Sequence, residues 1–523
     1  MLRFARGFTW RRCAFALAGT VGLAACLTNQ VSSSRRSRTL RLSIAGRLEG
    51  YALSLTRGYY EAYFATLVFE GLTRLDATGQ PAPSLATGWD MGSDGRSYRF
   101  RLRRGVRFHD GSPFGPADVV RAWETALREP RTSVRHPWML DLIEGADALA
   151  PGSQTHLAGV RARDDSTLEV RLVRPLSLFP RLIAEPQAFI GAASSDDARP
   201  VGTGPWRWLS GRAIGDTILV IRHDAYWGIR PRMDSVMIRV IPDSLLVRAF
   251  VAGQVDCTAD MTRETRTALA AWSDVRLTRM GPMGLVRIVF NLHKPPLQDV
   301  RVRRALGLAL DRQRLARETA AGPVIVANGP LPPGVLGADS TRPGIPYDPE
   351  GARRLLAETG LAFYGPFRMV LPDNETPEFS SNFSSLLQSY WRAVGLEVVQ
   401  WTSGDTGSAD IDVRVSYPDG TDPDDYLYSR FHSSVAGMGG NKGGFRDSLV
   451  DRWLDEGRLA GDTTIRARLM RAASARIDSL APNLILWYTP VTTASSTRIS
   501  DCVAGMATST FVDVDLAATP APT

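Results

Sequence analysis

Apolar and polar residues alternate strictly in one stretch of the chain, from Tyr98 to Arg103, where every second side chain is an arginine. A period of two is typical of a half-buried β-strand, with its apolar residues on one face. Asp94-Gly95 comes just before this stretch and supplies the turn of a β-hairpin. The pattern therefore predicts a strand at this position.

A helical period follows further along. Apolar residues recur on one face from Val119 to Leu127, with Pro116 placed to open the helix and Pro130 to end it. A second helix is predicted after Asp299, which is placed to cap it.

A third helix is predicted to begin at Asp348-Pro349-Glu350 and to end at Gly360. Leu168–Leu172 and Val236–Ile241 have the composition of strands. Strands and helices in alternation, without a repeat or a second long apolar run, predict α/β lobes.

Composition places the chain among globular proteins. It has 523 residues, 22% charged and 44% apolar, which suffices for two or three domains and excludes disordered, collagenous and small disulfide-rich classes. The formal net charge is +8, but residues 1–42 hold eight arginines and no acidic residue. The remainder is formally neutral, so the sequence predicts no binding of nucleic acid.

The amino terminus has the pattern of an export signal. Four arginines precede an apolar run from Cys13 to Ala25, which is too short for a stable membrane span. The run ends in Leu23-Ala24-Ala25-Cys26, which looks like a bacterial lipobox. We expect a lipoprotein signal peptide at 1–25 and lipid on Cys26, the alternative being a plain signal peptide with an incidental cysteine. Sec export and twin-arginine export, which Arg11-Arg12 weakly suggests, both stay open.

Polar residues follow this signal. Residues 26–38 have the composition of a flexible tether, and residues 516–523 that of a disordered tail. Two further cysteines, Cys257 and Cys502, remain in the exported part. They fit either a disulfide, as an oxidising compartment allows, or two separate buried thiols.

Motifs for catalysis are absent from the sequence. It contains no Gly-x-Ser-x-Gly, no His-Glu-x-x-His, no phosphate loop and only two lysines. His109-Asp110 is the nearest approach to a catalytic dyad, but it leads into an Asp-Gly turn and is interpreted as structural. Gly202-Thr203-Gly204 lacks the third glycine of a dinucleotide loop and is interpreted as a tight loop.

One acidic cluster stands out between Tyr417 and Tyr426. Its spacing does not match an EF-hand, so we interpret Asp422 and Asp424 as a turn or helix cap, with Ca²⁺ binding as the alternative. Asp419 follows a predicted strand directly and has a glycine beside it, where a carboxylate can face a cleft and meet a cation.

Several stretches together resemble the solute-binding proteins of ABC importers, family 5, the dipeptide and oligopeptide group. The similar stretches follow one another in order over nearly all of the exported chain. They are Leu67–Leu72, Pro83–Trp89, Asp94–Phe100, Arg104–Phe114, Ala117–Val120, Pro200–Trp206, Tyr226–Gly228, Gly253–Asp256, Phe290–Leu292, Lys294–Leu297, Val302–Leu306, Asp311-Arg312, Tyr347–Glu350 and Asp422–Asp424.

The resemblance implies a periplasmic-binding-protein fold, with two α/β lobes joined by a hinge. Lobe I would comprise residues 39–280 plus 486–515, with an extra subdomain at about 60–190, and lobe II residues 281–485. Cys257 and Cys502 would both lie in lobe I, which favours a disulfide between them.

The resemblance also implies a ligand site between the lobes. In characterised peptide-binding members an Asp three residues before an Asp-Pro step binds the terminal ammonium, and Asp419 matches that position. Those members tend to carry Trp three residues before the Asp, where this chain has Ser416 followed by Tyr417. Tyr59, Tyr60 and Asn441 lie where lobe edges face the cleft in relatives, with buried packing as the alternative for each.

The expected function is capture of a small peptide or another amine-bearing solute by an exported, monomeric lipoprotein on the periplasmic or outer face of the cytoplasmic membrane. Its partners would be an ABC permease and the ATPase subunits, and we expect no enzymatic activity, cofactor or metal. The alternatives are another cargo in the same family (a nickel chelate, haem, glutathione or an oligosaccharide) and, more remotely, a secreted hydrolase or a surface chaperone or adhesin.

Overall fold

The computed structural model describes residues 38–515, except for residues 45–64, 77–78, 131–138, 154, 197–198, 210–216, 259–260, 321, 361–365, 372–381, 402–408, 419–421, 438–439, 461, 501 and 503–513. The predicted signal peptide, the lipidation site Cys26 and the predicted tail lie outside the described residues. None of the helices in the described part combines the length and the apolar character that a bilayer span requires.

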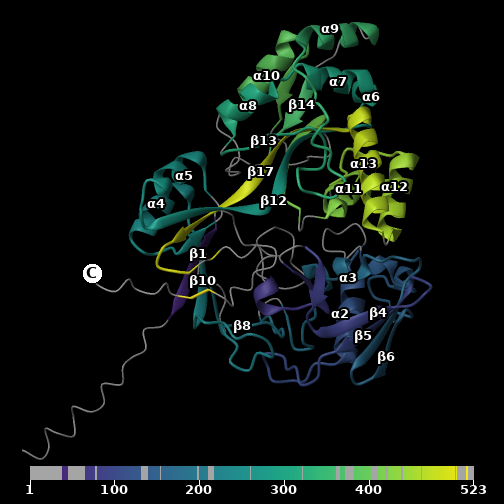
Figure 1. The fold of residues 1–523 in the computed structure, drawn as a ribbon, viewed down its shortest axis with the longest axis vertical. Helices are drawn as coiled ribbons and strands as arrows, with labels where there is room; N and C mark the ends of the chain where they lie inside the picture. Colours follow the sequence, from purple (N-terminus) through teal and green to yellow (C-terminus); the bar gives the residue numbers. More distant parts are fainter. Residues whose placement is uncertain are drawn as a thin grey trace, which may run out of the picture. The chain divides into compact units, whose positions relative to one another are not determined.

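Eleven strands of the described chain form one mixed sheet (Figure 1). Its strands in spatial order are β15 (Val398–Gln400), β14 (Phe367–Val370), β16 (Ile411–Ser416), β12 (Val275–Phe290), β17 (Asn483–Ser496), β11 (Cys257–Thr258), β1 (Thr39–Ile44), β10 (Ser235–Val240), β9 (Thr217–Arg222) and β8 (Trp206–Trp208), while β13 (Ile325–Val326) pairs with β17 off this path.

Two long antiparallel strands, β12 and β17, run through the middle of this sheet. They pair from Val275 opposite Ser496 to Val289 opposite Asn483. At one end β17 also pairs with β11, and at the other end β12 also pairs with β16. The predicted lobe boundaries at 280/281 and 485/486 fall inside these two strands; the boundaries themselves stay predictions.

Apolar side chains form separate cores on different parts of the large sheet. One core gathers residues of β1, β9 and β10 together with Cys257 and Cys502. On β12, Val286 and Ile288 join a core under α7–α10, whereas Leu285 joins a core with α11–α13. Neighbouring strand residues point to opposite faces, so the same strand feeds both cores.

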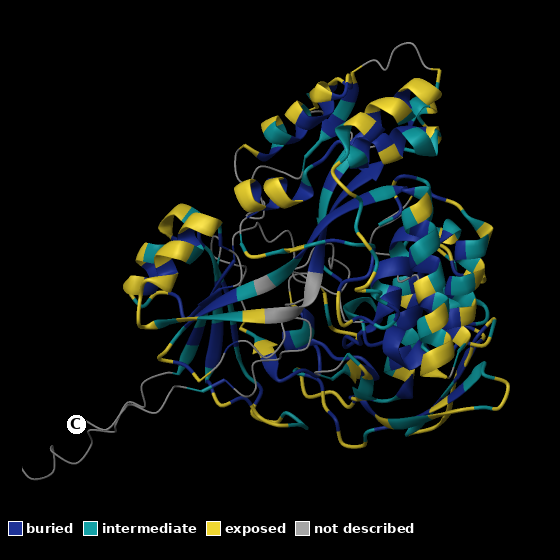
Figure 2. Ribbon diagram, turned by 45° about the horizontal axis from the view of Figure 1, so that its top comes forward, coloured by how far each residue is buried: buried dark blue, intermediate teal, exposed yellow. Residues whose placement is uncertain are grey.

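Most of the helices that cover these cores have buried and exposed residues on opposite sides (Figure 2), whereas α11 has no exposed residue. They are α4 (Asp243–Val251), α5 (Arg263–Ala270), α6 (Pro295–Gln298), α7 (Val300–Leu308), α8 (Arg312–Thr319), α9 (Pro349–Glu358), α10 (Phe383–Ala393), α11 (Pro423–Phe431), α12 (Ser448–Leu459) and α13 (Thr463–Leu480).

A smaller sheet lies within the predicted extra subdomain. It consists of β4 (Ala86–Met91), β5 (Ser97–Leu102), β7 (Thr167–Arg171) and β6 (Val160–Asp164), with α2 (Pro116–Leu127) and α3 (Phe179–Leu182) beside it and the hairpin β2 (Thr73–Leu75) and β3 (Pro81–Pro83). On β5, Tyr98, Phe100 and Leu102 are buried and the arginines between them are exposed. The predicted strand and the helix from Pro116 are therefore confirmed.

The predicted cap at Asp299 and the predicted helix start at Asp348 are also confirmed. Asp299 Oδ1 accepts a hydrogen bond of 2.8 Å from the Arg301 amide at the start of α7, and Asp348 Oδ1 accepts one of 2.8 Å from the Gly351 amide in α9. Gly360, just past α9, has φ +67°. The predicted strands at Leu168–Leu172 and Val236–Ile241 begin and end one residue earlier in the structure.

Three stretches that carry the family resemblance meet at one buried carboxylate, Glu70. It accepts hydrogen bonds from Tyr226 Oη (2.7 Å), Trp227 Nε1 (2.8 Å) and Thr203 Oγ1 (2.8 Å). Burial raises the pKa of Glu70 to about 7, and these hydrogen bonds oppose the rise. A Cβ on Gly204 would lie 2.6 Å from the Leu67 carbonyl oxygen, so the loop packs here without a side chain. The predicted tight loop at 202–204 is thus a packing element.

Candidate functional site

The predicted binding residues divide into two groups. Tyr59, Tyr60 and Asp419 lie outside the described residues. Tyr417 and Asn441 are described, and the roles proposed for all five stay predictions.

Tyr417 lies against the two long strands β12 and β17. It directly follows β16, whose last residue, Ser416, pairs with Leu285 on β12. A Cβ on Gly284 would lie 2.5 Å from Tyr417 Cε1 and 3.2 Å from Thr489 Cγ2. The ring therefore occupies space that only a glycine on β12 leaves open, and the side chain is half-buried beside β12 and β17.

Asn441 is buried and holds its own loop together. Its Nδ2 donates to the carbonyl oxygens of His432 and Phe445, each at 3.0 Å, and its Oδ1 accepts from the Phe445 amide at 2.9 Å. These bonds match the packing alternative, because they use the amide group within the protein.

The acidic cluster begins helix α11. Asp422 is its N-cap, with Asp425 completing a capping box, so the interpretation as a helix cap is confirmed. Asp422 also forms a bidentate pair with Arg466 (2.6 and 2.7 Å), and Asp424 one with Arg458 (2.7 and 2.6 Å). Burial opposes the ionised form of Asp422, but the hydrogen bonds and charge of Arg466 hold its pKa below the ordinary value. Arginines thus serve as counter-ions for these carboxylates.

Helix α3, which lies within the predicted extra subdomain, contributes a further arginine to this cluster. Arg181 of α3 is 3% exposed; its Nη2 donates to Asp425 Oδ2, and its Nε lies 3.9 Å from Asp422 Oδ2. Nearby, Arg174 Nη1 pairs with Asp455 of α12 at 3.1 Å, and Ser177 Oγ donates to the Arg458 carbonyl at 3.0 Å. Residues about 244 to 281 positions apart in the chain are therefore joined by polar contacts. We call these contacts the α3–α11/α12 contact.

His109 and Asp110 point to different partners. His109 Nε2 lies 2.9 Å from the Gly204 carbonyl oxygen, and burial lowers the pKa of His109 to about 4. Asp110 Oδ1 accepts from the amide and hydroxyl of Ser112 at 2.9 and 2.6 Å, and Ser194 donates to its other oxygen. The structural interpretation of this pair is confirmed.

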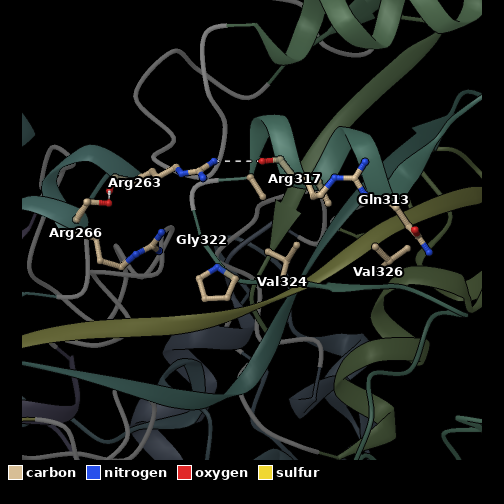
Figure 3. Close-up of a pocket in the computed structure, with 11 residues that line it drawn as sticks. Arg263, Arg266, Gln313, Arg317, Gly322, Val324 and Val326 are labelled. Carbon is tan, nitrogen blue, oxygen red and sulfur yellow. Dashed lines mark hydrogen bonds between the residues drawn. The ribbon is translucent and has the colours of Figure 1, made fainter. Parts of the chain in front are cut away.

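A cavity of about 670 Å³ opens between α5, α8 and β13 (Figure 3). Arg263 and Arg266 reach it from α5, and Arg317 and Gln313 from α8, so its lining comes from both sides of the predicted boundary at 280/281. The rest of the lining is mostly small or apolar: Thr267, Ala316, Ala320, Gly322, Pro323, Val324 and Val326. We call this cavity the arginine pocket.

The electrostatics of the arginine pocket are cationic. Arg263 Nη1 donates to the main-chain oxygen of Arg317 at 3.3 Å, the dashed contact in Figure 3, so a carbonyl rather than a carboxylate receives it. Burial lowers the pKa of Arg266, the charges of Arg263 and Arg279 lower it further, and Glu264 opposes them. Such a site favours an anionic group.

Neither Arg181 nor the arginines of this pocket are marked by a signal in the sequence. No motif marks them among the 62 lysines and arginines of the chain, and Arg263 and Arg317 are 54 residues apart. The acidic cluster at Asp422–Asp425 indicates that cationic partners are needed, but it does not indicate which arginines supply them.

Cys257 and Cys502 are paired as a disulfide in the structure, with Cα atoms 6.4 Å apart. Both side chains are buried in the core of β1, β9 and β10. The described residues contain no cluster of three His, Cys, Asp or Glu side chains suited to a metal ion.

Comparison with known proteins gives one family. The model of the bacterial extracellular solute-binding proteins, family 5, matches residues 80–438. The dipeptide-binding protein of Escherichia coli is 24% identical over 88% of this chain and 91% of its own length, and heme-binding protein A of Haemophilus influenzae is 26% identical over 76% and 77%. The structure of the ABC transporter-associated periplasmic binding protein DppA from Helicobacter pylori, in complex with peptide STSA, has a TM-score of 0.81 at 19% identity and covers 91% of this chain and 98% of that one. With a family model that matches well over half of the chain and a shared two-lobed α/β fold, this chain belongs to the bacterial extracellular solute-binding proteins of family 5.

Proposed function

We propose that this protein captures a small peptide, or another amine-bearing solute, between its lobes and delivers it to the membrane permease of an ABC importer. ATP hydrolysis takes place in separate subunits of that importer. The observation that carries the proposal is the match to a dipeptide-binding protein over 88% of the chain. Family membership supports binding without turnover.

Asp419 is the proposed anchor for the ammonium group of the solute. It follows β16 by three residues and Tyr417 by two, and Tyr417 lies against β12 and β17. An extended peptide offers backbone donors and acceptors whatever its side chains, so one buried anion for the terminal charge suffices to fix its register. A charge-assisted hydrogen bond of this kind contributes about 1.5–3 kcal/mol.

Titration calorimetry with a panel of di- and tripeptides tests this role. Asp419→Ala is expected to weaken binding by about tenfold or more while leaving the melting temperature of the free protein nearly unchanged. Asp165→Ala, which removes an exposed carboxylate of the β6–β7 hairpin, is the matched control and should bind as the wild type does. Equal affinity of Asp419→Ala and the wild type would sink the ammonium-anchor role.

A second cargo class has a specific observation behind it. Heme-binding protein A of H. influenzae and the nickel-binding periplasmic protein of E. coli, 23% identical over 84% of the chain, are also similar to this protein. Native mass spectrometry of gently purified protein distinguishes the cargoes, because a retained peptide, haem or nickel chelate differs in mass.

We also propose that the protein is a monomer anchored by lipid on Cys26, after removal of residues 1–25. Cys26→Ser is expected to release the mature protein from the membrane fraction. A variant that still sediments with membranes would contradict the lipid anchor.

A further inference from the structure

The arginine pocket combines a charged rim with an apolar wall. Guanidinium groups reach it from two helices, with Arg263 and Arg266 on α5 and Arg317 on α8. Pro323, Val324 and Val326 form part of the wall beside β17 (Figure 3). At about 670 Å³ the pocket has the size of a small-molecule site.

The charges on the rim have few acidic neighbours. Within the described chain, no carboxylate lies within ion-pair distance of Arg263 or Arg317. Arg314 on the same helix α8 differs from Arg317, because it forms an ion pair with Glu318 at 2.7 Å on the surface. Arg263 donates to the Arg317 carbonyl oxygen, so among the described residues neither guanidinium has a carboxylate as its counter-ion.

Arg266 sits deeper than the other two. A Cβ on Gly322 would overlap its Nη1, so the guanidinium packs directly on the backbone at the start of the segment that leads into β13. Like charges around a partly buried guanidinium repel one another, and an anion between them removes that cost. A planar guanidinium also matches a carboxylate or phosphate with two parallel hydrogen bonds.

We propose that the arginine pocket is a subsite for an oxyanion of the bound solute, a carboxylate or a phosphate, whose apolar part packs on Pro323, Val324 and Val326. The inference rests on the proposed function, since it assumes that a solute is captured. It deepens that function by specifying acidic solutes as the preferred class. Because the pocket takes residues from α5 and α8, one anion would contact chain on both sides of the predicted lobe boundary.

Calorimetry with four probes tests the proposal: Ala-Ala-Glu, Ala-Ala-Ala, its C-terminal amide, and inorganic phosphate. The wild type is expected to bind Ala-Ala-Glu at least about tenfold more tightly than the amide. The difference between Ala-Ala-Glu and Ala-Ala-Ala measures the effect of an acidic side chain, and the difference between Ala-Ala-Ala and its amide measures the effect of the terminal carboxylate. Inorganic phosphate tests whether the pocket binds a phosphate group.

The test variant is Arg263→Gln/Arg317→Gln, which is expected to lose the preference for the acidic probes. Gly322→Ala, which must displace the Arg266 guanidinium, is expected to weaken it. Arg314→Gln is the matched control, because it removes an arginine of α8 that does not line the pocket. Unchanged melting temperatures exclude misfolding as the cause.

Each outcome decides. Loss of the preference in the double variant but not in Arg314→Gln supports the subsite. Peptide binding that ignores both the acidic group and the arginine substitutions overturns the subsite and leaves the proposed function standing. Phosphate binding that depends on the arginines, without peptide binding, supports the subsite and counts against peptide as cargo. Failure of all four probes with the wild type overturns both.

Discussion

In the α3–α11/α12 contact, the buried side chain of Arg181 is predicted to contribute to the free energy of unfolding. This side chain is 3% exposed, and the carboxylates it meets, Asp425 and Asp422, are 7% and 5% exposed at their side chains. Burial alone lowers the pKa of Arg181, but the charges of Asp425 and Asp422 raise it above its ordinary value. Arg181→Met keeps most of the volume and removes the charge, which leaves two buried carboxylates without this guanidinium.

Removal of one partner from a buried ion pair typically costs about 3–5 kcal/mol, because the remaining charge stays desolvated. Asp422 keeps its pair with Arg466, so Asp425 bears most of the loss. We expect Arg181→Met to lower the free energy of unfolding by about 3 kcal/mol or more, measured by urea unfolding with circular dichroism. Arg181→Met/Asp425→Asn should recover part of that loss, since the stranded charge is then absent.

The control is Arg314→Met, which breaks an equally direct but exposed pair. Arg314 and Glu318 are 51% and 40% exposed, so solvent screening should hold the change below about 0.5 kcal/mol. If Arg181→Met also stayed within 1 kcal/mol of the wild type, or if Asp425→Asn made the loss larger, the assignment of Arg181 as a buried counter-ion would be refuted.

Three further predictions concern other parts of the fold. Glu70 has an ordinary pKa of 4.5 and a folded pKa of about 7, so between these pH values the folded protein keeps a proton that the unfolded chain releases. The contribution of Glu70 to the free energy of unfolding is therefore full below pH 4.5 and is lost as the pH rises through 7. Glu70→Gln should therefore show a smaller fall in unfolding free energy from about pH 5 to about pH 8 than the wild type, by on the order of 3 kcal/mol, and an unchanged slope would contradict the raised pKa. Cys502→Ser should lower the free energy of unfolding by about 2–5 kcal/mol, and alkylation of the unfolded wild type should label Cys257 and Cys502 only after reduction; labelling of both without reductant would rule out the disulfide. Asp348→Ala should cost about 1 kcal/mol by removing the cap of α9, whereas Asp348→Asn should cost much less; equal losses would assign the effect to charge rather than to capping.

Local features of the fold were predictable from the sequence because local interactions decide them. The alternation at Tyr98–Arg103 specifies which side chains of β5 are buried, whatever lies opposite. Asp299 and Asp348 cap helices through amides only two or three residues away. The helix cap at Asp422 was also predictable, although the arginines that neutralise the cluster were not.

Non-local features could not be derived in the same way. Arg181 shows this limit: no pattern around it in the sequence indicates that it meets Asp425, which is 244 residues away. The arginine pocket shows it too, because its rim depends on how α5 and α8 meet around β12 and β17. A periodic pattern reports which face of an element is buried and carries no information about the element it meets.

The sequence by itself thus determined an α/β chain with capped helices at Asp299 and Asp348 and an ordered series of stretches similar to family 5. Only the tertiary structure decided that Arg181 meets Asp425 across 244 residues, that Glu70 meets Thr203 and Trp227, and that three arginines share one pocket. The physical reason is the range of the interactions. The groups that form a helix cap or a strand pattern are only a few residues apart in the sequence, whereas an ion pair between residues hundreds of positions apart forms only once the fold has brought its partners together.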